Sequence, residues 1–328
     1  MGEGLRSLDG LEWETGHVKA LAWSPVRDDD GSLLLATTGS RDWSARLWNV
    51  ASGECLRTFS GHSKGVVTLA FSQDGKHLAT GSWDKVAKVW EAATGACLRS
   101  FKHEGCVNSL AFSSNNFLAT ATRCLVKLWR AFGDPVEERT FEGHSDSVVA
   151  VAFSPINGEI LATGSWDKTV RLWLSSDNCR ILAGHERCVS SVVFSSSGEY
   201  LATGSLDNTA RLWDVQSGAC LRTFVHDHFV NSVALAPDDL YLATGTFDKE
   251  AKLWSVASGA CLKTFDDHAA CVTSVAFSPE GTLLATASNQ KARLWHIQAF
   301  DTAADDDFVK IDATNNNNNP IEDFVMVI

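Results

Sequence analysis

The sequence predicts an all-β fold made of seven copies of one short unit. Seven of its 12 Trp close a nearly repeated tetrapeptide, such as ARLW or VKLW, at intervals of 39 to 44 residues. These marker residues are Trp48, Trp90, Trp129, Trp173, Trp213, Trp254 and Trp295. A period in the low forties, with short strand patterns inside each copy, is typical of a propeller. We therefore expect a single seven-bladed β-propeller over residues 1–299, followed by a tail over residues 300–328.

Each copy contains four apolar runs separated by turn residues. In the copy that begins near residue 146, the runs are SVVAVAFSP, EILATGS, TVRLW and CRIL. They are short, rich in β-branched or aromatic residues and bounded by Gly, Asp, Asn or Ser, which is the pattern of antiparallel hairpins. The sequence therefore predicts four antiparallel strands in each blade.

The fourth run also indicates how the ring closes. It reads GECLRTF, GACLRSF, GACLRTF or GACLKTF in four copies, and no such run follows Trp295. The N-terminus, however, reads GEGLRSL, with Gly4 at the Cys position. Because closure of a ring removes exposed sheet edges, we expect Leu5–Leu8 to form the outer strand of blade 7.

Two polar residues recur in register with the Trp markers. A His precedes each marker by 26 to 31 residues, at His17, His62, His103, His144, His185, His226 and His268. In five copies an Asp lies six residues before the marker, at Asp42, Asp84, Asp167, Asp207 and Asp248. This order of His, a LATGS-like strand, Asp and Trp resembles the WD-repeat family, from the N-terminus to about Gln298. The resemblance implies blades around a central channel, with the His loops and the Asp turns on one narrow face.

The resemblance further implies that these polar residues form a structural hydrogen-bonded network in each blade, in which a Ser or Thr joins the His to the indole N–H. The predicted sets are His17, Ser40, Asp42 and Trp48; His62, Ser82, Asp84 and Trp90; His144, Ser165, Asp167 and Trp173; His185, Ser205, Asp207 and Trp213; and His226, Thr246, Asp248 and Trp254. An enzyme seldom repeats its site in every copy, whereas a fold repeats its hydrogen bonds. The other histidines show no ligand spacing, so we predict no catalytic site, no metal site and no cofactor.

The turn around each Asp carries the candidate partner-binding residues. They are Arg41, Trp83, Trp166, Leu206 and Phe247 directly before the Asp, and Trp43, Lys85, Lys168 and Lys249 directly after it. Turns usually carry small polar residues, whereas exposed aromatic clusters mark contact sites, and Trp and Arg dominate interface energetics. We therefore expect this face to contact a protein partner. The alternative is that each ring packs on the neighbouring blade.

Two copies depart from the pattern at the Asp position. Blade 3 is one residue short there and has Arg123, and blade 7 has Asn289 or Gln290. Their networks are incomplete, so we expect looser turns, or turns that serve a particular partner.

The nine cysteines also follow the repeat. Most occupy one outer-strand position or lie three residues after the His, and none forms a C-x-x-C pair. Because the ring holds equivalent positions apart, we expect reduced thiols that serve as small buried hydrophobic groups. A Lys or Arg stands two residues before every marker Trp. We expect its stem to lie along the sheet with its charge in solvent.

The charge of the chain excludes some partners. The 328 residues include 28 Lys and Arg against 40 Asp and Glu, for a net charge of −12. Direct contact with nucleic acid or an anionic membrane is not expected, since such binding draws on a basic surface. No apolar run approaches the ~20 residues of a membrane helix, and the start MGEGLRSLDG lacks a signal segment. The expected location is the cytoplasm, with the nucleus as the alternative.

Residues 300–328 differ in composition from the rest. They hold seven acidic residues, one Lys and a run of five Asn. We expect a solvated, disordered tail, since acidic runs are usually solvated. The alternative is that its last eight residues, IEDFVMVI, add as a strand to a partner's sheet.

Together these features predict a non-catalytic scaffold or adaptor, a monomeric propeller within a larger complex. The alternative is a substrate-recognition subunit of a ubiquitin ligase or of a ciliary, centriolar or RNA-processing assembly. A cullin-ligase receptor of this family would carry W-D-x-R, yet Trp213-Asp214 is followed by Val215-Gln216. A propeller enzyme is the remote alternative, because no acid, base or metal residues outside the repeat cluster at persuasive spacing.

Overall fold

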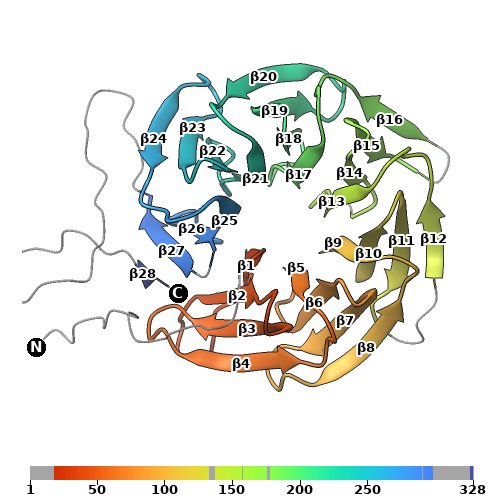
Figure 1. Ribbon diagram of the computed structural model, residues 1–328, viewed down its shortest axis with the longest axis vertical. Coiled ribbons are helices and arrows are strands. Elements are labelled where there is room, and N and C mark those ends of the chain that lie inside the picture. The colour runs from red at the N-terminus through yellow and green to blue at the C-terminus, as the bar shows by residue number, and fades with distance from the viewer. Residues whose placement is uncertain are drawn as a thin grey trace, which may run out of the picture.

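The strands alternate with short turns around a ring in the computed structural model of the chain (Figure 1). The structure describes residues 18–132, 137–156, 158–175, 178–289 and 291–297, together with the backbone of residues 326 and 327. The strands form seven four-stranded sheets, and each sheet is one blade. The predicted seven-bladed propeller with four antiparallel strands per blade is therefore confirmed.

The four strands of each blade follow one another in space in chain order. The first, innermost strands are β1 (Leu21–Trp23), β5 (Val66–Phe71), β9 (Val107–Phe112), β13 (Val148–Phe153), β17 (Val189–Phe194), β21 (Val230–Leu235) and β25 (Val272–Phe277). The second strands are β2 (Leu34–Thr38), β6 (His77–Ser82), β10 (Phe117–Thr122), β14 (Leu161–Ser165), β18 (Tyr200–Ser205), β22 (Tyr241–Thr246) and β26 (Leu283–Ser288).

The third strands contain the marker Trp residues. They are β3 (Ser44–Asn49), β7 (Val86–Glu91), β11 (Leu125–Arg130), β15 (Val170–Trp173), β19 (Thr209–Asp214), β23 (Ala251–Ser255) and β27 (Lys291–His296). The fourth, outermost strands are β4 (Cys55–Ser60), β8 (Cys97–Lys102), β12 (Glu137–Phe141), β16 (Cys179–Leu182), β20 (Cys220–Val225), β24 (Cys261–Phe265) and β28 (Met326–Val327).

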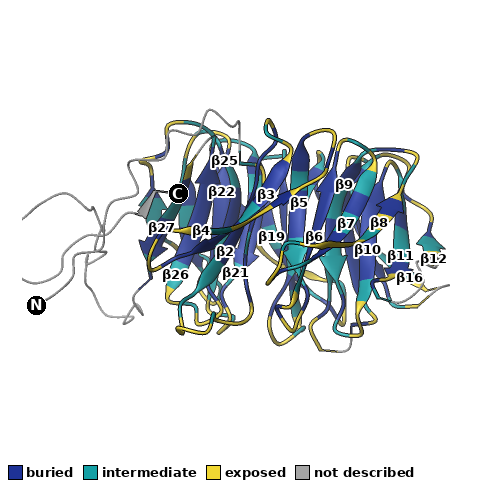
Figure 2. Ribbon diagram, turned by 90° about the horizontal axis from the view of Figure 1, so that it is seen from below, coloured by how far each residue is buried: buried dark blue, intermediate teal, exposed yellow. Residues whose placement is uncertain are grey.

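The hydrophobic core is divided among the interfaces between neighbouring blades. One buried cluster lies at each interface; between blades 1 and 2 it joins Leu47 and Phe59 to Leu78 and Trp90. The LATGS-like second strands are buried on both faces, whereas the outer strands are largely exposed (Figure 2). Glycine permits the close approach of blades here, since a Cβ on Gly81 would lie 2.7 Å from a methyl group of Val107 in blade 3.

Blade 7 and blade 1 meet through several hydrogen bonds. The indole N–H of Trp23 donates to the carbonyl of Ala276 at 3.0 Å, and the amide of Val18 donates to the carbonyl of Asn289 at 2.6 Å. The predicted closing strand, Leu5–Leu8, lies outside the described residues. In the structure β28 pairs with β27, through Arg293 with Val327 and Leu294 with Met326, and so occupies the outer position of blade 7.

The cysteines correct one expectation. Those of the outer strands β4, β8, β20 and β24 are exposed, and the other five are half-buried, so none is a buried core residue. The reason is that only one side of the outermost strand packs on the rest of the protein, so the other side faces the solvent. All nine are free thiols. In the described part of the chain, no helix is long and apolar enough to cross a membrane.

Candidate protein-interaction face

In five blades, a turn held by the repeated Asp joins the second strand to the third. In blade 2, the carboxylate of Asp84 accepts hydrogen bonds from the amide of Val86 at 2.9 Å and from the amide of Ser63, in the loop before β5, at 2.9 Å. Lys85, between Asp84 and Val86, has a φ of 69°, in the left-handed region that few non-glycine residues adopt. Asp84 thus fixes the turn and ties it to the His loop on the narrow face.

The buried network continues from this Asp to the marker Trp. In blade 2, His62 Nδ1 lies 2.8 Å from the Asp84 carboxylate, and His62 Nε2 lies 2.8 Å from Thr80 Oγ1. The indole N–H of Trp90 donates to the same Thr80 oxygen at 2.8 Å. The same three contacts occur in blades 4 and 5, through His144 and His185. Every polar group of the network therefore has a partner.

The hydroxyl in this network corrects the sequence prediction. It belongs to a Thr two residues before the predicted Ser in blade 2, and the predicted Ser82 instead donates to the Lys64 carbonyl and accepts from the Asp84 amide. The same holds for Ser165 and Ser205 in blades 4 and 5. In all seven blades the indole donates to a Thr: Thr37, Thr80, Thr120, Thr163, Thr203, Thr244 and Thr286.

Blades 1 and 6 depart from the predicted sets. His17 lies outside the described residues, and Asp42 contacts Arg46 and Ser44 of its own blade. In blade 6, His226 Nδ1 bonds to the Phe224 carbonyl at 3.1 Å instead of to the Asp, and Thr246 donates to Asp248. Ser40 and Thr246 are therefore not the hydroxyls that meet the indoles of these blades.

Burial disfavours the charged form of four of the repeated histidines. Burial lowers the pKa of His62 and His144, although the hydrogen bonds that these rings donate to Asp84 and Asp167 oppose that effect. Where no carboxylate bonds to the ring, burial lowers the pKa of His226 and His268 to about 4. A neutral ring that donates from Nδ1 accepts the Thr proton at Nε2, as a structural role requires.

Blades 3 and 7 have tight two-residue turns, not the looser turns that the sequence predicts. Thr122 pairs directly with Leu125, and Ser288 pairs directly with Lys291. Without the Asp, the shorter loop closes as a hairpin, with φ of 49° at Arg123. These turns therefore lack the residue that the other blades place before the Asp.

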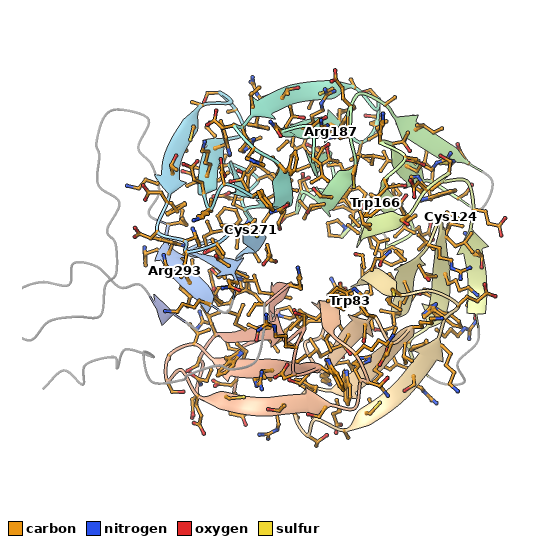
Figure 3. The ribbon with its side chains drawn as sticks, viewed as in Figure 1. Trp83, Cys124, Trp166, Arg187, Cys271 and Arg293 are labelled. Atoms are coloured by element: carbon orange, nitrogen blue, oxygen red, sulfur yellow. The ribbon has the colours of Figure 1, made fainter. Side chains whose placement is uncertain are left out.

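The residue directly before the Asp is exposed on the narrow face in blades 1, 2, 4 and 6. Its amide donates to the carbonyl of the neighbouring His loop: Trp83 to Gly65 at 3.1 Å, Trp166 to Ser147 at 2.9 Å and Phe247 to Phe229 at 2.9 Å. The exposed fractions are 44% for Trp83, 56% for Trp166, 51% for Phe247 and 48% for Trp43. Arg41, Lys85, Lys168 and Lys249 are exposed as well, whereas Leu206 is half-buried. Trp83 and Trp166 lie near the inner rim of the ring (Figure 3).

Blades 5 and 6 add residues that sequence reasoning missed. The ring of Phe247 stacks on His228 with a centroid distance of 5.0 Å and lies 6.0 Å from Phe229. Arg187 of blade 5 stands 5.8 Å from the centre of the Phe229 ring. The available signal was a pair of aromatic residues in the His loop, two and three positions after the His. This face thus presents half-exposed rings with cationic neighbours on a rigid frame.

The described residues contain no group of three or more His, Cys, Asp or Glu side chains that could hold a metal ion. In blades 2, 4 and 5 the repeated His and Asp residues are engaged with each other in the networks above. The fold and these networks define a seven-bladed propeller in which a His, a Thr and a Trp recur in the blades.

The chain belongs to the WD-repeat family. The family described as "WD domain, G-beta repeat" matches residues 12–49, 53–91, 95–130, 136–173, 176–214, 218–255 and 259–296. These seven matches follow the seven blades.

Several curated proteins are similar to this chain. Nuclear distribution protein PAC1 from Fusarium vanettenii is 37% identical over 228 residues, which cover 67% of this chain and 45% of that protein. A ribosome biogenesis protein WDR12 homolog from Drosophila persimilis is 29% identical over 163 residues, which cover 48% of this chain and 32% of that protein. The chain thus spans less than half the length of these relatives.

Proposed function

We propose that this protein is a non-catalytic scaffold that binds partner proteins, or peptide segments of them, on its narrow face. The observation that carries the proposal is the display of Trp43, Trp83, Trp166 and Phe247, each about half exposed, on turns of one face. A soluble chain seldom leaves several aromatic rings exposed on one face unless they meet another molecule. Aromatic side chains supply much of the energy at protein interfaces.

The turns that carry these rings are built to hold their shape. The backbone of Trp83 is bonded to Gly65, and the following Asp84 ties the turn to the His loop. A rigid turn loses little conformational freedom on binding, so more of the contact energy appears as affinity. The flanking Lys85 and Lys168 add positive charge beside the rings, which favours partner segments with acidic residues.

The relatives favour the same class of function. They include proteins named for nuclear distribution and for ribosome biogenesis. For this chain we propose a monomeric propeller that joins a larger complex in the cytoplasm or the nucleus, through protein contacts and without direct contact with nucleic acid or a membrane.

The proposal is tested by affinity capture from the native cell with mass spectrometry. The full chain is compared with the double variant Trp83→Ala and Trp166→Ala. We expect the double variant to lose the main partner while its melting temperature stays within a few degrees, because both rings are half exposed. The matched control is Leu98→Ala with Leu221→Ala, which removes two exposed apolar side chains from the outer strands β8 and β20. Equal capture by all three proteins would contradict the proposal.

A further inference from the structure

A groove opens on the face opposite the aromatic turns, between blades 4 and 5. Its volume is about 630 Å³, within the range of ligand and peptide sites. Ile156, Ile160, Leu174 and Tyr200 give it an apolar lining. Ile156 is 67% exposed, which makes it one of the most exposed apolar side chains described. We call this the blade 4 groove.

One loop of blade 4 is a residue shorter than its counterpart in blade 5. Six positions separate Trp173 from Cys179, whereas seven separate Trp213 from Cys220 in blade 5. Blade 5 accommodates the extra residue as an irregularity between its third and fourth strands, and blade 4 pairs these strands without one.

The hydrogen bonds of the loops show the same difference. In blade 5 the amide of Val215 donates to the carbonyl of Glu199 at 2.9 Å. This bond joins the segment after the third strand to the turn between the first and second strands. Blades 1, 2, 3, 6 and 7 make the equivalent bond. In blade 4 the equivalent amide, of Ser175, donates to Asn178 within its own loop at 3.3 Å.

A second hollow of about 390 Å³ lies on the other side of the same loop, between blades 3 and 4. Phe117, Leu128 and Phe153 line it, and Leu174 borders both hollows. Leu174 therefore stands as an apolar ridge between two depressions. An extended peptide that crosses it could place one side chain on each side.

The rim of the groove is acidic. Glu199 and Asp214 line it, and Asp239 of blade 6 reaches its edge by accepting from the amide of Ser197 at 3.0 Å. Hydrogen bonds from Ser217 lower the pKa of Asp214, so this group is ionised at neutral pH. The cation that lines the groove, Arg180, donates to the carbonyls of Val215 and Gln216, and its guanidinium is engaged by the protein.

We propose that the blade 4 groove docks a basic peptide segment of a partner protein, with two aliphatic side chains placed on either side of Leu174. The lining supplies the apolar contact and the acidic rim supplies the charge complementarity. A second copy of this chain is a poor occupant, because a chain of net charge −12 repels its own acidic rim. This site is separate from the aromatic turns, so one ring could join two partners.

The test is a selection of random 12-residue peptides displayed on phage against the immobilised full chain, followed by fluorescence polarisation with the enriched peptides. We expect enriched peptides with net positive charge and at least two aliphatic residues. Grafting the blade 5 loop, residues 214–219, in place of residues 174–178 should fill the groove and weaken their binding about tenfold or more, as loss of a central apolar contact does.

Point variants keep the test valid if the graft fails to fold. Ile156→Lys adds a positive charge at an exposed position, and Glu199→Lys reverses a rim charge; each should weaken binding roughly three- to tenfold. Glu54→Lys, at an exposed site in the third-to-fourth-strand loop of blade 1, is the matched control and should change binding by less than about twofold. The proposal is overturned if no enriched peptide distinguishes these variants from the wild type, or if the groove-dependent peptides are acidic.

Discussion

The turns of blades 2, 4 and 5 differ in structure from those of blades 3 and 7, and the difference follows from the presence or absence of one carboxylate. Where Asp is present, as at Asp84, the turn is long and bonds to the His loop, and in blades 2 and 4 it exposes a Trp before the Asp. Where Arg123 or Asn289 replaces it, the strands close through two residues and expose no large apolar side chain. The comparison indicates that the Asp holds the longer turn, which carries the residues that we propose contact a partner.

The largest expected effect is a dependence of stability on pH, which arises from one histidine each in blades 6 and 7. His226 and His268 lack a carboxylate bond, and their pKa is about 4 in the folded protein against about 6.5 in an unfolded chain. Between these values the unfolded state binds more protons, so stability is full above pH 6.5 and falls as the pH drops towards 4. Each histidine contributes a slope of about 1.4 kcal/mol per pH unit, or about 4 kcal/mol for both at pH 5.

Urea unfolding at pH 7.5, 6 and 5 checks this expectation. The stability at pH 7.5 and at pH 8.5 should agree, since neither histidine titrates there. Histidine resonances in NMR would show which rings resist protonation, and a free energy of unfolding that stays constant down to pH 5 would refute the account.

The next effect follows from removal of the Asp. Asp84→Ala removes the acceptor for two amides and for His62, and it should lower the free energy of unfolding by about 3 kcal/mol. Chemical denaturation measures the change. Glu104→Ala in blade 3 is the control, because its pair with Arg123 is exposed and 3.7 Å long, and its loss should cost less than about 0.5 kcal/mol. Equal losses would remove the distinction between the two kinds of blade.

A third comparison tests the identity of the network hydroxyl. Thr163→Val keeps the shape but leaves His144 and the Trp173 indole without their buried partner, so it should cost about 2–3 kcal/mol. Ser165→Ala removes the bond to the Asp146 carbonyl and the bond from the Asp167 amide, and it should cost about 1 kcal/mol. Urea midpoints of the two variants decide the matter, and a larger loss for Ser165→Ala would favour the original sequence interpretation.

The smallest effect concerns backbone strain in the long turns. Lys168 has a φ of 72°, which a side chain disfavours and glycine accepts. Lys168→Gly should therefore raise the free energy of unfolding by roughly 0.5–1 kcal/mol. The control is Lys64→Gly in the His loop of blade 2, where φ is not positive, and this change should not stabilise the protein. A loss of stability in Lys168→Gly would show that its side chain contributes to the turn.

Much of the fold could be predicted because the markers repeat. Each of the seven Trp stands in a third strand, and the interval between them specifies four short strands per blade. The network hydroxyl could not be chosen by spacing, because Thr80 and Ser82 are two apart in one strand and share a face. A usable signal was present, however: the position of Thr80, the earlier of the two, is a Thr in all seven copies, including blades 3 and 7.

The remaining misses have physical causes as well. The shortening at Arg123 was visible in the sequence, but only the strand register shows that it closes a tight hairpin. The cluster of Arg187, His228 and Phe247 joins two blades, and such contacts across an interface depend on how the blades pack. The blade 4 groove likewise lies between two blades, so its lining depends on how blades 4 and 5 pack.

The central claim is that the aromatic turns of the narrow face bind a partner. Once capture has identified that partner, calorimetry with the purified pair gives the most direct test. The variant with Trp83→Ala and Trp166→Ala should bind at least about thirtyfold more weakly, which corresponds to the ~2 kcal/mol typical of an interface hot spot. The control with Leu98→Ala and Leu221→Ala should bind within about twofold of the wild type. An unchanged Kd for the Trp variant would contradict the account.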